Sequence, residues 1–410
     1  MAARTLVGLF GLTAAAAQKG LDARIERALA QARPALATVL EGAHELVPGQ
    51  LALVCLAAVH DGMPHDEAPL QPALERLREA RMERTYDLAL RLMVTEATSF
   101  ATRSKLAAAD CKRLLKNREG GAFGYSPGTG GWDLSNTQYA ALGLRAAAAC
   151  GVEVTRHVWL RLADDVFEAQ ADVGGFGYVP GSNPTPSMTV AGIGVLAICE
   201  QALQQQQREL PGLAPRLLRA WAWMDEQAAA IGRPETVWSY YFHYGLERAA
   251  ILCDREDVGG VDWYREGARM LVTAQGRDGS WQSEQRVFGL PVGIEGSPVD
   301  TAFAVLFLRR RFQKVLGPVT AARTVVLDAL GAQAPAADVD ACTAGLVRRG
   351  RSALPDVLRA LRSDVAPRRE AAVRALRAIA GEDFGIDPAR SADDNRSALR
   401  RAELWYLKTR

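Results

Sequence analysis

The residues best placed to do chemistry lie in the segment VWSYYFHYGLER, residues 237–248. On a helix, Tyr240, Tyr244 and Glu247 share one face because they are four and three positions apart. His243 lies one turn before Glu247, so the two side chains can meet. A histidine beside a carboxylate can act as a general acid and base near neutral pH. The alternative is a buried histidine that is satisfied by a carboxylate and by tyrosine hydroxyls.

A second candidate group lies at the starts of predicted apolar helices. Asp300 precedes Thr301, and Asn136 precedes Thr137, at positions where a short polar side chain commonly caps a helix. If these helix starts meet at one mouth, they would rim a pocket that favours an anionic group. The predicted catalytic residues are Asp300, His243 and Glu247, and the predicted ligand-binding residues are Trp132, Asp133, Asn136, Trp238, Tyr240, Tyr241 and Tyr244.

No metal or cofactor is predicted. Residues 60–66 read HDGMPHD, which holds four potential ligands, but the embedded glycine and proline favour a solvated turn. The glycine-rich loops lack the G-x-G-x-x-G spacing of a dinucleotide site. A net charge of +2 over 410 residues argues against a nucleic-acid partner. No stretch after the N-terminus reaches the length of apolar sequence that a membrane span needs, so no integral span is predicted.

Six apolar segments are predicted to position these residues. They are residues 49–59, 84–94, 136–146, 188–198, 240–250 and 300–310. Thr85, Thr137, Thr189 and Tyr241 are each 52 residues apart, and these equal intervals indicate an internal repeat. Amphipathic segments alternate with the apolar ones, at 70–81, 155–170 and 262–275. We therefore predict an all-α protein in which six inner and six outer helices close into an (α/α)6 toroid.

Glycine-rich loops with an embedded aromatic residue follow the outer helices, and one of them carries a recognisable motif. Residues 266–281 read EGARMLVTAQGRDGSW, and residues 167–178 are a weaker copy. The residues that match the motif are Gly267, Gln275, Gly279 and Trp281 in the first segment, and Gln170, Gly174 and Phe176 in the second. The motif resembles the QW repeat of terpenoid cyclases (squalene cyclase-like proteins) and protein prenyltransferases.

The resemblance covers roughly residues 45–312. It is closest to bacterial prenyltransferase-like and squalene-oxidase-repeat proteins, whose activity is generally unassigned. It implies a toroid in which the glutamine bonds a helix end and neighbouring backbone, while the aromatic residue packs between helices. The catalytic motifs of the family are missing, because the chain has neither D-x-D-D nor D-D-x-x-D. The positions of the prenyltransferase zinc ligands fall near Ser239, Tyr241 and Asp300, which supply one carboxylate where catalytic zinc needs about three ligands.

The N-terminus resembles a secretory signal peptide. Residues 1–17 contain Arg4, an apolar run and a possible cut after Ala17, which predicts export to the periplasm or beyond. The alternative is the apolar start of a helix in a cytoplasmic protein. The six cysteines are scattered, and we expect them to be buried free thiols, with one or two disulfides possible in an exported protein.

The predicted toroid occupies residues 18–314, and a helical extension occupies residues 315–410. Residues 354–387 look like one HEAT-type helix pair, which cannot bury its apolar faces alone and should dock on the toroid. A stripe of arginines on this pair is expected to face solvent: Arg359, Arg362, Arg368, Arg369, Arg374 and Arg377.

Three functions remain open at this level. The first is binding of an apolar, isoprenoid or otherwise extended ligand in a central cavity without catalysis. The second is a divergent cyclase-like or prenyltransferase-like enzyme, and the third is a scaffold for a protein partner. An open aromatic cavity with converging acids would favour an enzyme, whereas an interior filled with side chains would leave the scaffold.

Overall fold

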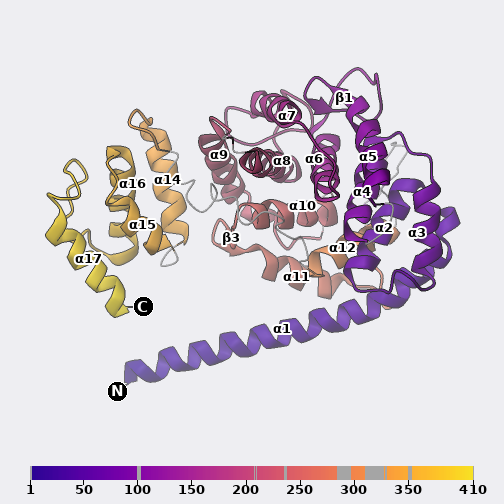
Figure 1. Ribbon diagram of the computed structural model, residues 1–410. Coiled ribbons are helices and arrows are strands. Elements are labelled where there is room, and N and C mark those ends of the chain that lie inside the picture. Colours follow the sequence, from indigo (N-terminus) through magenta and orange to yellow (C-terminus); the bar gives the residue numbers. More distant parts are fainter. Residues whose placement is uncertain are drawn as a thin grey trace. The chain divides into compact units, whose positions relative to one another are not determined.

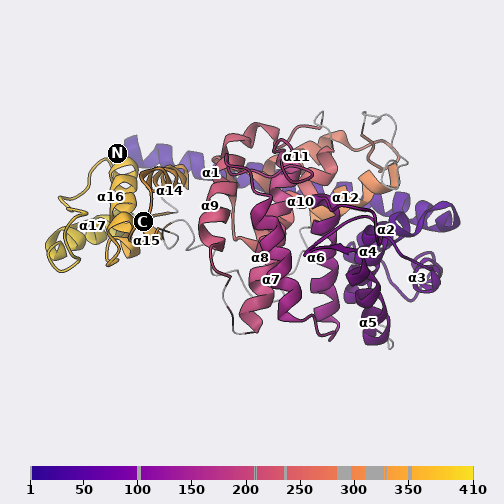
Figure 2. The same ribbon diagram turned by 90° about the horizontal axis from the view of Figure 1, so that it is seen from above.

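The computed structural model describes residues 2–98, 103–206, 208, 210–234, 238–283, 297–309, 327, 330–349 and 353–409. Helices make up 66% of the chain and strands 3%, which confirms the predicted all-α class. Figure 1 and Figure 2 show the helices in two perpendicular views. The chain divides into two compact units. Unit 1 comprises Met1–Thr155, Ala229–Arg248 and Trp263–Gln313, and unit 2 comprises Arg156–Ala228, Ala249–Asp262 and Lys314–Arg410. The predicted boundaries at residues 17 and 314 stay predictions.

Unit 1 holds most of the predicted inner helices. Its elements are α1 (Ala2–Glu41), α2 (Pro48–His60), α3 (Leu70–Glu79), α4 (Thr85–Ala97), α5 (Arg103–Leu114), β1 (Arg118–Glu119), β2 (Ala122–Phe123), α6 (Leu134–Ala149), α10 (Ser239–Leu252), α11 (Trp263–Ala274) and α12 (Ser297–Arg309). The last turn of α10, after Arg248, belongs to unit 2. β1 and β2 form a short antiparallel hairpin. Single 3-10 turns cover Ala43–Glu45, Leu115–Asn117 and Ala228–Ala230.

The apolar helices of unit 1 lie in a row. α12 packs on α2, α2 on α4, and α4 on α6. Amphipathic helices cover this row: α1 packs on α2, α3, α11 and α12, while α5 packs on α4 and α6. Apolar and amphipathic helices therefore pack against one another in unit 1 (Figure 1).

Burial explains the two types of sequence. In α2 every side chain from Leu51 to Ala58 is buried, which requires a helix that is apolar all round. In α1 the described buried side chains form a stripe with helical spacing instead. They are Leu21, Ile25, Ala28, Leu29, Ala32, Leu36 and Leu40. The second half of α1 is therefore an outer helix of the fold, and the sequence analysis did not identify it.

The repeat has a structural basis at the start of the inner helices. There a threonine hydroxyl accepts a hydrogen bond from the backbone N–H of the aromatic residue in the preceding loop. The pairs are Thr137 with Phe123 at 3.1 Å, Thr189 with Phe176 at 3.0 Å, and Thr301 with Trp281 at 2.9 Å. Each bond satisfies a buried loop amide and fixes the loop to the helix that follows.

In unit 1 the glutamine of the QW-like motif bonds neighbouring backbone, as expected, but its second partner lies within α1 and not at a helix end. Gln275 Nε2 donates to the Gly279 carbonyl oxygen at 3.0 Å and to the Ala28 carbonyl oxygen at 2.8 Å. Trp281 is fully buried, and its Nε1 donates to the Leu271 carbonyl oxygen at 2.8 Å. The motif therefore joins α11 and its loop to α1.

Unit 2 contains the weaker copy of the motif. Its elements are α7 (Arg156–Glu168), α8 (Pro186–Gln205), α9 (Leu213–Glu226), β3 (Asp257–Val258), β4 (Val261–Asp262), α14 (Ala336–Arg349), α15 (Leu354–Ala360), α16 (Ala366–Ala380) and α17 (Arg396–Thr409). β3 and β4 form a second short hairpin. α8 packs on α7 and α9. Gln170 Nε2 donates to the Gly174 carbonyl oxygen at 2.7 Å and to the Arg216 carbonyl oxygen at 2.9 Å, which repeats the Gln275 arrangement.

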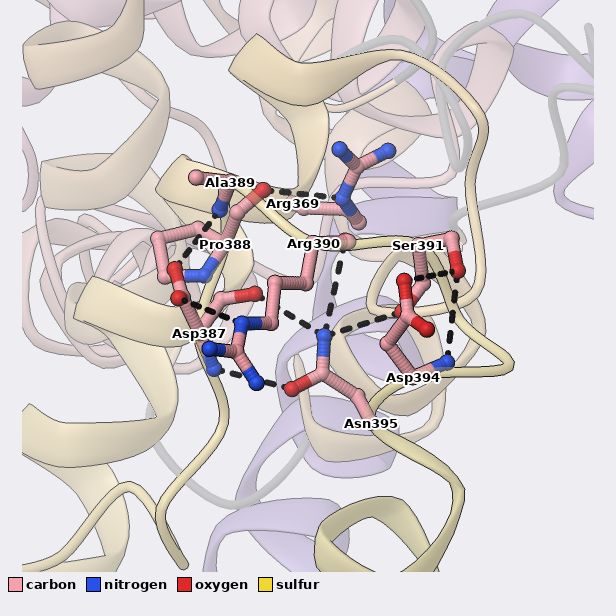
Figure 3. Close-up of polar contacts among 8 residues, drawn as sticks. All are labelled: Arg369, Asp387, Pro388, Ala389, Arg390, Ser391, Asp394 and Asn395. Carbon is pink, nitrogen blue, oxygen red and sulfur yellow. Dashed lines mark hydrogen bonds and ion pairs between the residues drawn. The ribbon is translucent and has the colours of Figure 1, made fainter.

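The C-terminal helices of unit 2 share a core that includes Leu218 of α9. α16 packs on α14 and α15, and α15 also contacts α17. The loop before α17 is fixed by Asn395, whose Oδ1 accepts from the Asp387 N–H at 3.0 Å (Figure 3). Asn395 Nδ2 donates to the carbonyl oxygens of Asp387 at 2.9 Å and Ser391 at 3.0 Å.

One member of the predicted solvent-facing arginine stripe is not in solvent. Arg369 is 5% exposed, and its Nε donates to the Pro388 carbonyl oxygen at 2.9 Å (Figure 3). Its Nη1 donates to the Ser363 carbonyl oxygen at 2.7 Å. The stripe prediction was wrong here because the long arginine side chain satisfies loop carbonyls that would otherwise be buried without a donor.

All six cysteines are free and buried, as predicted. Burial raises the pKa of the Cys55 thiol to about 12, so it is not a reactive thiolate at neutral pH. Of the described helices, α8 is the one that is long and apolar enough to cross a membrane. Because 83% of its apolar window is buried inside the protein, it has the character of a core helix.

Candidate functional site

One predicted site residue, Tyr241, belongs to a group of bonded side chains at the N-terminal ends of the inner helices. Tyr241 OH of α10 donates to Gln138 Oε1 at 2.9 Å and lies 2.7 Å from Ser135 Oγ of α6. Ser135 Oγ lies 2.5 Å from Tyr86 OH of α4. The four side chains form one hydrogen-bonded chain that links three inner helices.

Aromatic rings fill the interior beside this chain. The ring centroids of Tyr86 and Tyr139 are 4.7 Å apart, and those of Tyr139 and Tyr241 are 6.3 Å apart. Phe303 of α12 continues the row, at 6.1 Å from Tyr241 and 4.9 Å from Tyr244. Burial raises the pKa of Tyr244 to about 12 and also raises the pKa of Tyr241. These phenols therefore stay protonated at neutral pH and act as donors and packing surfaces.

The polar residues at these helix starts act as caps and loop contacts. Asp133, and not Asn136, is the N-cap of α6, since its carboxylate accepts from the Asn136 backbone N–H at 2.8 Å. Asn136 Nδ2 donates to the same carboxylate at 2.8 Å. Asp300 Oδ2 accepts from the Ser283 N–H at 2.7 Å, which ties a loop to the first turn of α12. Trp238 is 40% exposed in a left-handed conformation with φ of 61°.

Trp132 is half-buried and Tyr240 is buried. The prediction that Trp132, Trp238 and Asp300 rim a ligand pocket stays a prediction.

His243 is held by backbone groups on both sides of its ring. Its Nε2 accepts from the Gly232 N–H at 3.0 Å, so the proton must lie on Nδ1, which is 2.8 Å from the Ser239 carbonyl oxygen. Burial lowers the pKa of His243 to about 4. The imidazole is therefore neutral at pH 7, with both ring nitrogens bonded to backbone groups, and the predicted acid–base pair with Glu247 stays a prediction.

A pocket of about 280 Å³ lies near the opposite ends of the inner helices in unit 1. Every residue that lines it belongs to the C-terminal half of α2, α4, α6, α10 or α12. The lining residues are Leu56, Val59, His60, Met93, Glu96, Ala97, Arg145, Glu247, Arg248 and Leu306. Five are apolar and five are ionisable; we call the first set the apolar wall and the second set the charged wall.

Four of the five residues of the charged wall form two ion pairs, and the fifth is His60. Arg248 Nη1 lies 3.2 Å from Glu247 Oε2, and the two side chains are 5% and 2% exposed. Arg248 also donates to the Tyr244 carbonyl oxygen at 3.1 Å, and its guanidinium lies over the Tyr244 ring. Arg145 Nη1 lies 3.4 Å from Glu96 Oε2, with exposures of 11% and 24%.

The surroundings of Arg145 affect its pKa and the stability of its charge. Burial lowers the pKa of Arg145, Glu96 opposes that change, and the positive charge of Arg248 adds to it. The two arginines therefore lie close enough to repel each other. Helix C-termini carry partial negative charge, which favours arginine side chains at this end of the inner helices.

Of the predicted site residues, Glu247 is the one that lines the pocket, and Tyr244 adjoins it through Arg248. Glu96, Arg145 and Arg248 are pocket residues that sequence reasoning did not select. The signal that could have identified them is a charge in the last turns of helices that are otherwise apolar.

Among the described residues, no group of three or more histidine, cysteine, aspartate or glutamate side chains is arranged to hold a metal ion. Within the segment at 60–66, Asp61 instead accepts from Arg33 at 2.8 Å and from Arg309 at 2.7 Å. A buried carboxylate between two arginines joins α1, α2 and α12, so this aspartate has a structural role.

A scan against models of known protein families finds no match, and a search of curated proteins finds no relative.

Proposed function

We propose that this chain is a binding protein for a small amphipathic molecule, which enters the pocket between the C-terminal halves of the inner helices. The observation that carries the proposal is the division of the pocket into an apolar wall and a charged wall. Ligand pockets typically combine a mainly apolar lining with a few placed polar groups, over volumes of about 300–1,000 Å³. A volume of about 280 Å³ favours a short molecule over an extended isoprenoid.

Binding is a better account of the site than catalysis. Both ring nitrogens of His243 bond backbone groups, and each glutamate in the pocket faces an arginine. A general base must reach the proton that it removes, and carboxylates paired in this way are poor candidates. The aromatic interior is packed, so an extended ligand would have to displace ring contacts between Tyr139, Tyr241 and Phe303.

The proposed architecture is an (α/α)6 toroid with a C-terminal HEAT-like extension, of the type found in terpenoid cyclases and protein prenyltransferases. The row α12–α2–α4–α6 supports it, as do the outer helices that cover this row. The equivalent bonds of Gln170 and Gln275 support it as well. The proposed location is outside the cytoplasm, on the ground of the signal-peptide-like residues 1–17. Their removal would leave the buried stripe from Leu21 to Leu40 intact.

Binding of simple eight-carbon amphiphiles tests the proposal. Octanoate, octanol and octylammonium are titrated into the full chain, and binding is followed by calorimetry and by ligand-observed NMR. Ala97 lines the pocket on its exposed edge, so Ala97→Trp should block the opening without disturbing the core. Ala108, exposed on α5, provides the matched control Ala108→Trp.

We expect at least one of the three probes to bind, Ala97→Trp to abolish that binding and Ala108→Trp to retain it. Absence of binding by all three, or equal binding by the two tryptophan variants, would reject the proposed function.

A further inference from the structure

The two ion pairs of the pocket differ in how firmly they are held. Arg248 and Glu247 are both almost fully buried, and Arg248 has additional contacts with the Tyr244 ring and carbonyl. The Arg145–Glu96 pair is more exposed to solvent, at 11% and 24%, and its two charged groups lie 3.4 Å apart. Arg145–Glu96 is therefore the ion pair in which a charged ligand can replace one of the two side chains.

Another ion pair of unit 1, Arg91–Asp110, provides a comparison because its arginine is held firmly. Arg91 Nε and Nη2 lie 2.7 and 2.6 Å from the two oxygens of Asp110, and the side chains are 2% and 0% exposed. Charge-assisted hydrogen bonds of this length and bidentate geometry are the strong ones. The contact between Arg145 and Glu96 is longer and more exposed to solvent, so this ion pair is weaker.

The exposures of Arg145 and Glu96 decide which partner can leave. Glu96 is 24% exposed and can turn its carboxylate into water at little cost, since a solvated carboxylate needs no protein partner. Arg145 is 11% exposed, and leaving it without an anion in the pocket wall is more costly. Replacement of Glu96 by a ligand anion is therefore easier than replacement of Arg145 by a ligand cation. The positive charge of Arg248 nearby also favours an added anion.

We propose that the ligand of this pocket is a carboxylate with a short apolar tail, and that its carboxylate replaces Glu96 on Arg145. The tail lies against the apolar wall, which includes Leu56, Met93 and Leu306. The planar guanidinium suits a carboxylate because two parallel N–H groups can meet its two oxygens. This inference rests on the proposed function, since it names the class of molecule that the same pocket binds.

Relative affinities for octanoate, octanol and octylammonium test the inference in the wild-type chain. We expect octanoate to bind on the order of 10- to 100-fold more tightly than octanol, as a charge-assisted hydrogen bond would give, and octylammonium to bind weakest. Arg145→Gln should reduce the preference for octanoate over octanol to less than about threefold. Glu96→Gln should increase octanoate affinity, because it removes the internal carboxylate that competes for Arg145.

Arg113→Gln provides the matched control, since Arg113 is a half-exposed arginine outside the pocket that lies 3.3 Å from Asp110. It should leave the octanoate preference at the wild-type value. The opposite signs expected for Glu96→Gln and Arg145→Gln separate ligand recognition from a structural role, because loss of a structural ion pair would weaken binding in both variants.

Several outcomes would overturn the inference while the proposed function stands. These are equal binding of octanoate and octanol, tighter binding of octylammonium, or weaker octanoate binding by Glu96→Gln. Absence of binding by all three probes would instead reject the proposed function itself.

Discussion

Replacement of Asp110 by alanine should destabilise unit 1 more than loss of the more exposed ion pair of the pocket, Arg145–Glu96. Asp110 accepts two short hydrogen bonds from Arg91 inside the protein, where the side chains are 0% and 2% exposed. Asp110→Ala would leave the Arg91 charge buried without its anion, and such losses cost about 3–5 kcal/mol. The matched change Glu96→Ala, in the partly exposed pair with Arg145, should cost clearly less than Asp110→Ala.

A double-mutant cycle makes this prediction quantitative. Arg91 also donates to the carbonyl oxygens of Leu77 at 3.1 Å and Ala80 at 2.5 Å at the end of α3, so Arg91→Ala loses these bonds as well. The double variant retains no uncompensated charge. Its free energy of unfolding should fall by only about 2 kcal/mol, because the two carbonyl oxygens lose their donor. The coupling energy of the cycle should therefore be at least about 3 kcal/mol.

The assay is equilibrium unfolding in urea, with Arg113→Ala as the control. Arg113 is 48% exposed and contacts the same carboxylate at 3.3 Å, so its loss should cost less than about 1 kcal/mol. A cost below about 1 kcal/mol for Asp110→Ala, or a double variant equal to the sum of the single variants, would refute the reasoning.

Three further predictions concern other parts of the chain. Because the pKa of His243 is lowered to about 4, the stabilisation from its neutral form is complete above pH about 6.5 and is lost as the pH falls toward 4. The loss should reach about 3 kcal/mol, and a urea series across pH should show a flatter profile for His243→Gln. Gly279 has φ of +83°, and an added Cβ would lie 2.1 Å from the Gln31 carbonyl oxygen. Gly279→Ala should therefore lower the melting temperature far more than Gly130→Ala, since Gly130 has φ of +78° but open space around it; equal effects would contradict the clash. Asn395→Ala should cost about 2–3 kcal/mol from three lost hydrogen bonds and should raise proteolysis of the 387–394 loop; unchanged cleavage would argue against its role.

Sequence patterns predicted the helices well because the inner helices are buried on all sides. Continuous apolar runs such as LALVCLAAV at 51–59 have no other stable place in a protein. The outer role of α1 was not predicted, since the sequence analysis assigned residues 1–17 to a signal peptide and began the apolar segments at residue 49. The buried stripe of α1 becomes evident only through its contacts with α2, α3, α11 and α12.

The pocket was harder to predict than the helices. Sequence reasoning selected the N-terminal ends of the inner helices because polar residues gather there. In the structure those residues satisfy one another, as Asp133 does with Asn136 and Ser135 does with Tyr241. The pairing of Glu96 with Arg145 depends on the contact between α4 and α6, and no spacing along the chain reveals it.

The bond between Gln275 and Ala28 has a consequence for the synthesis of the protein. The α1 residues that it holds leave the ribosome early, whereas Gln275 follows 247 positions later. At about 5–20 residues per second, this interval is roughly 12–50 s. Throughout it, the apolar stripe of α1 has neither α11 nor α12 to cover it, and an exposed stripe of this kind is a binding site for chaperones. The N-terminal helix is thus among the first parts of unit 1 to be made and among the last that can reach its final contacts.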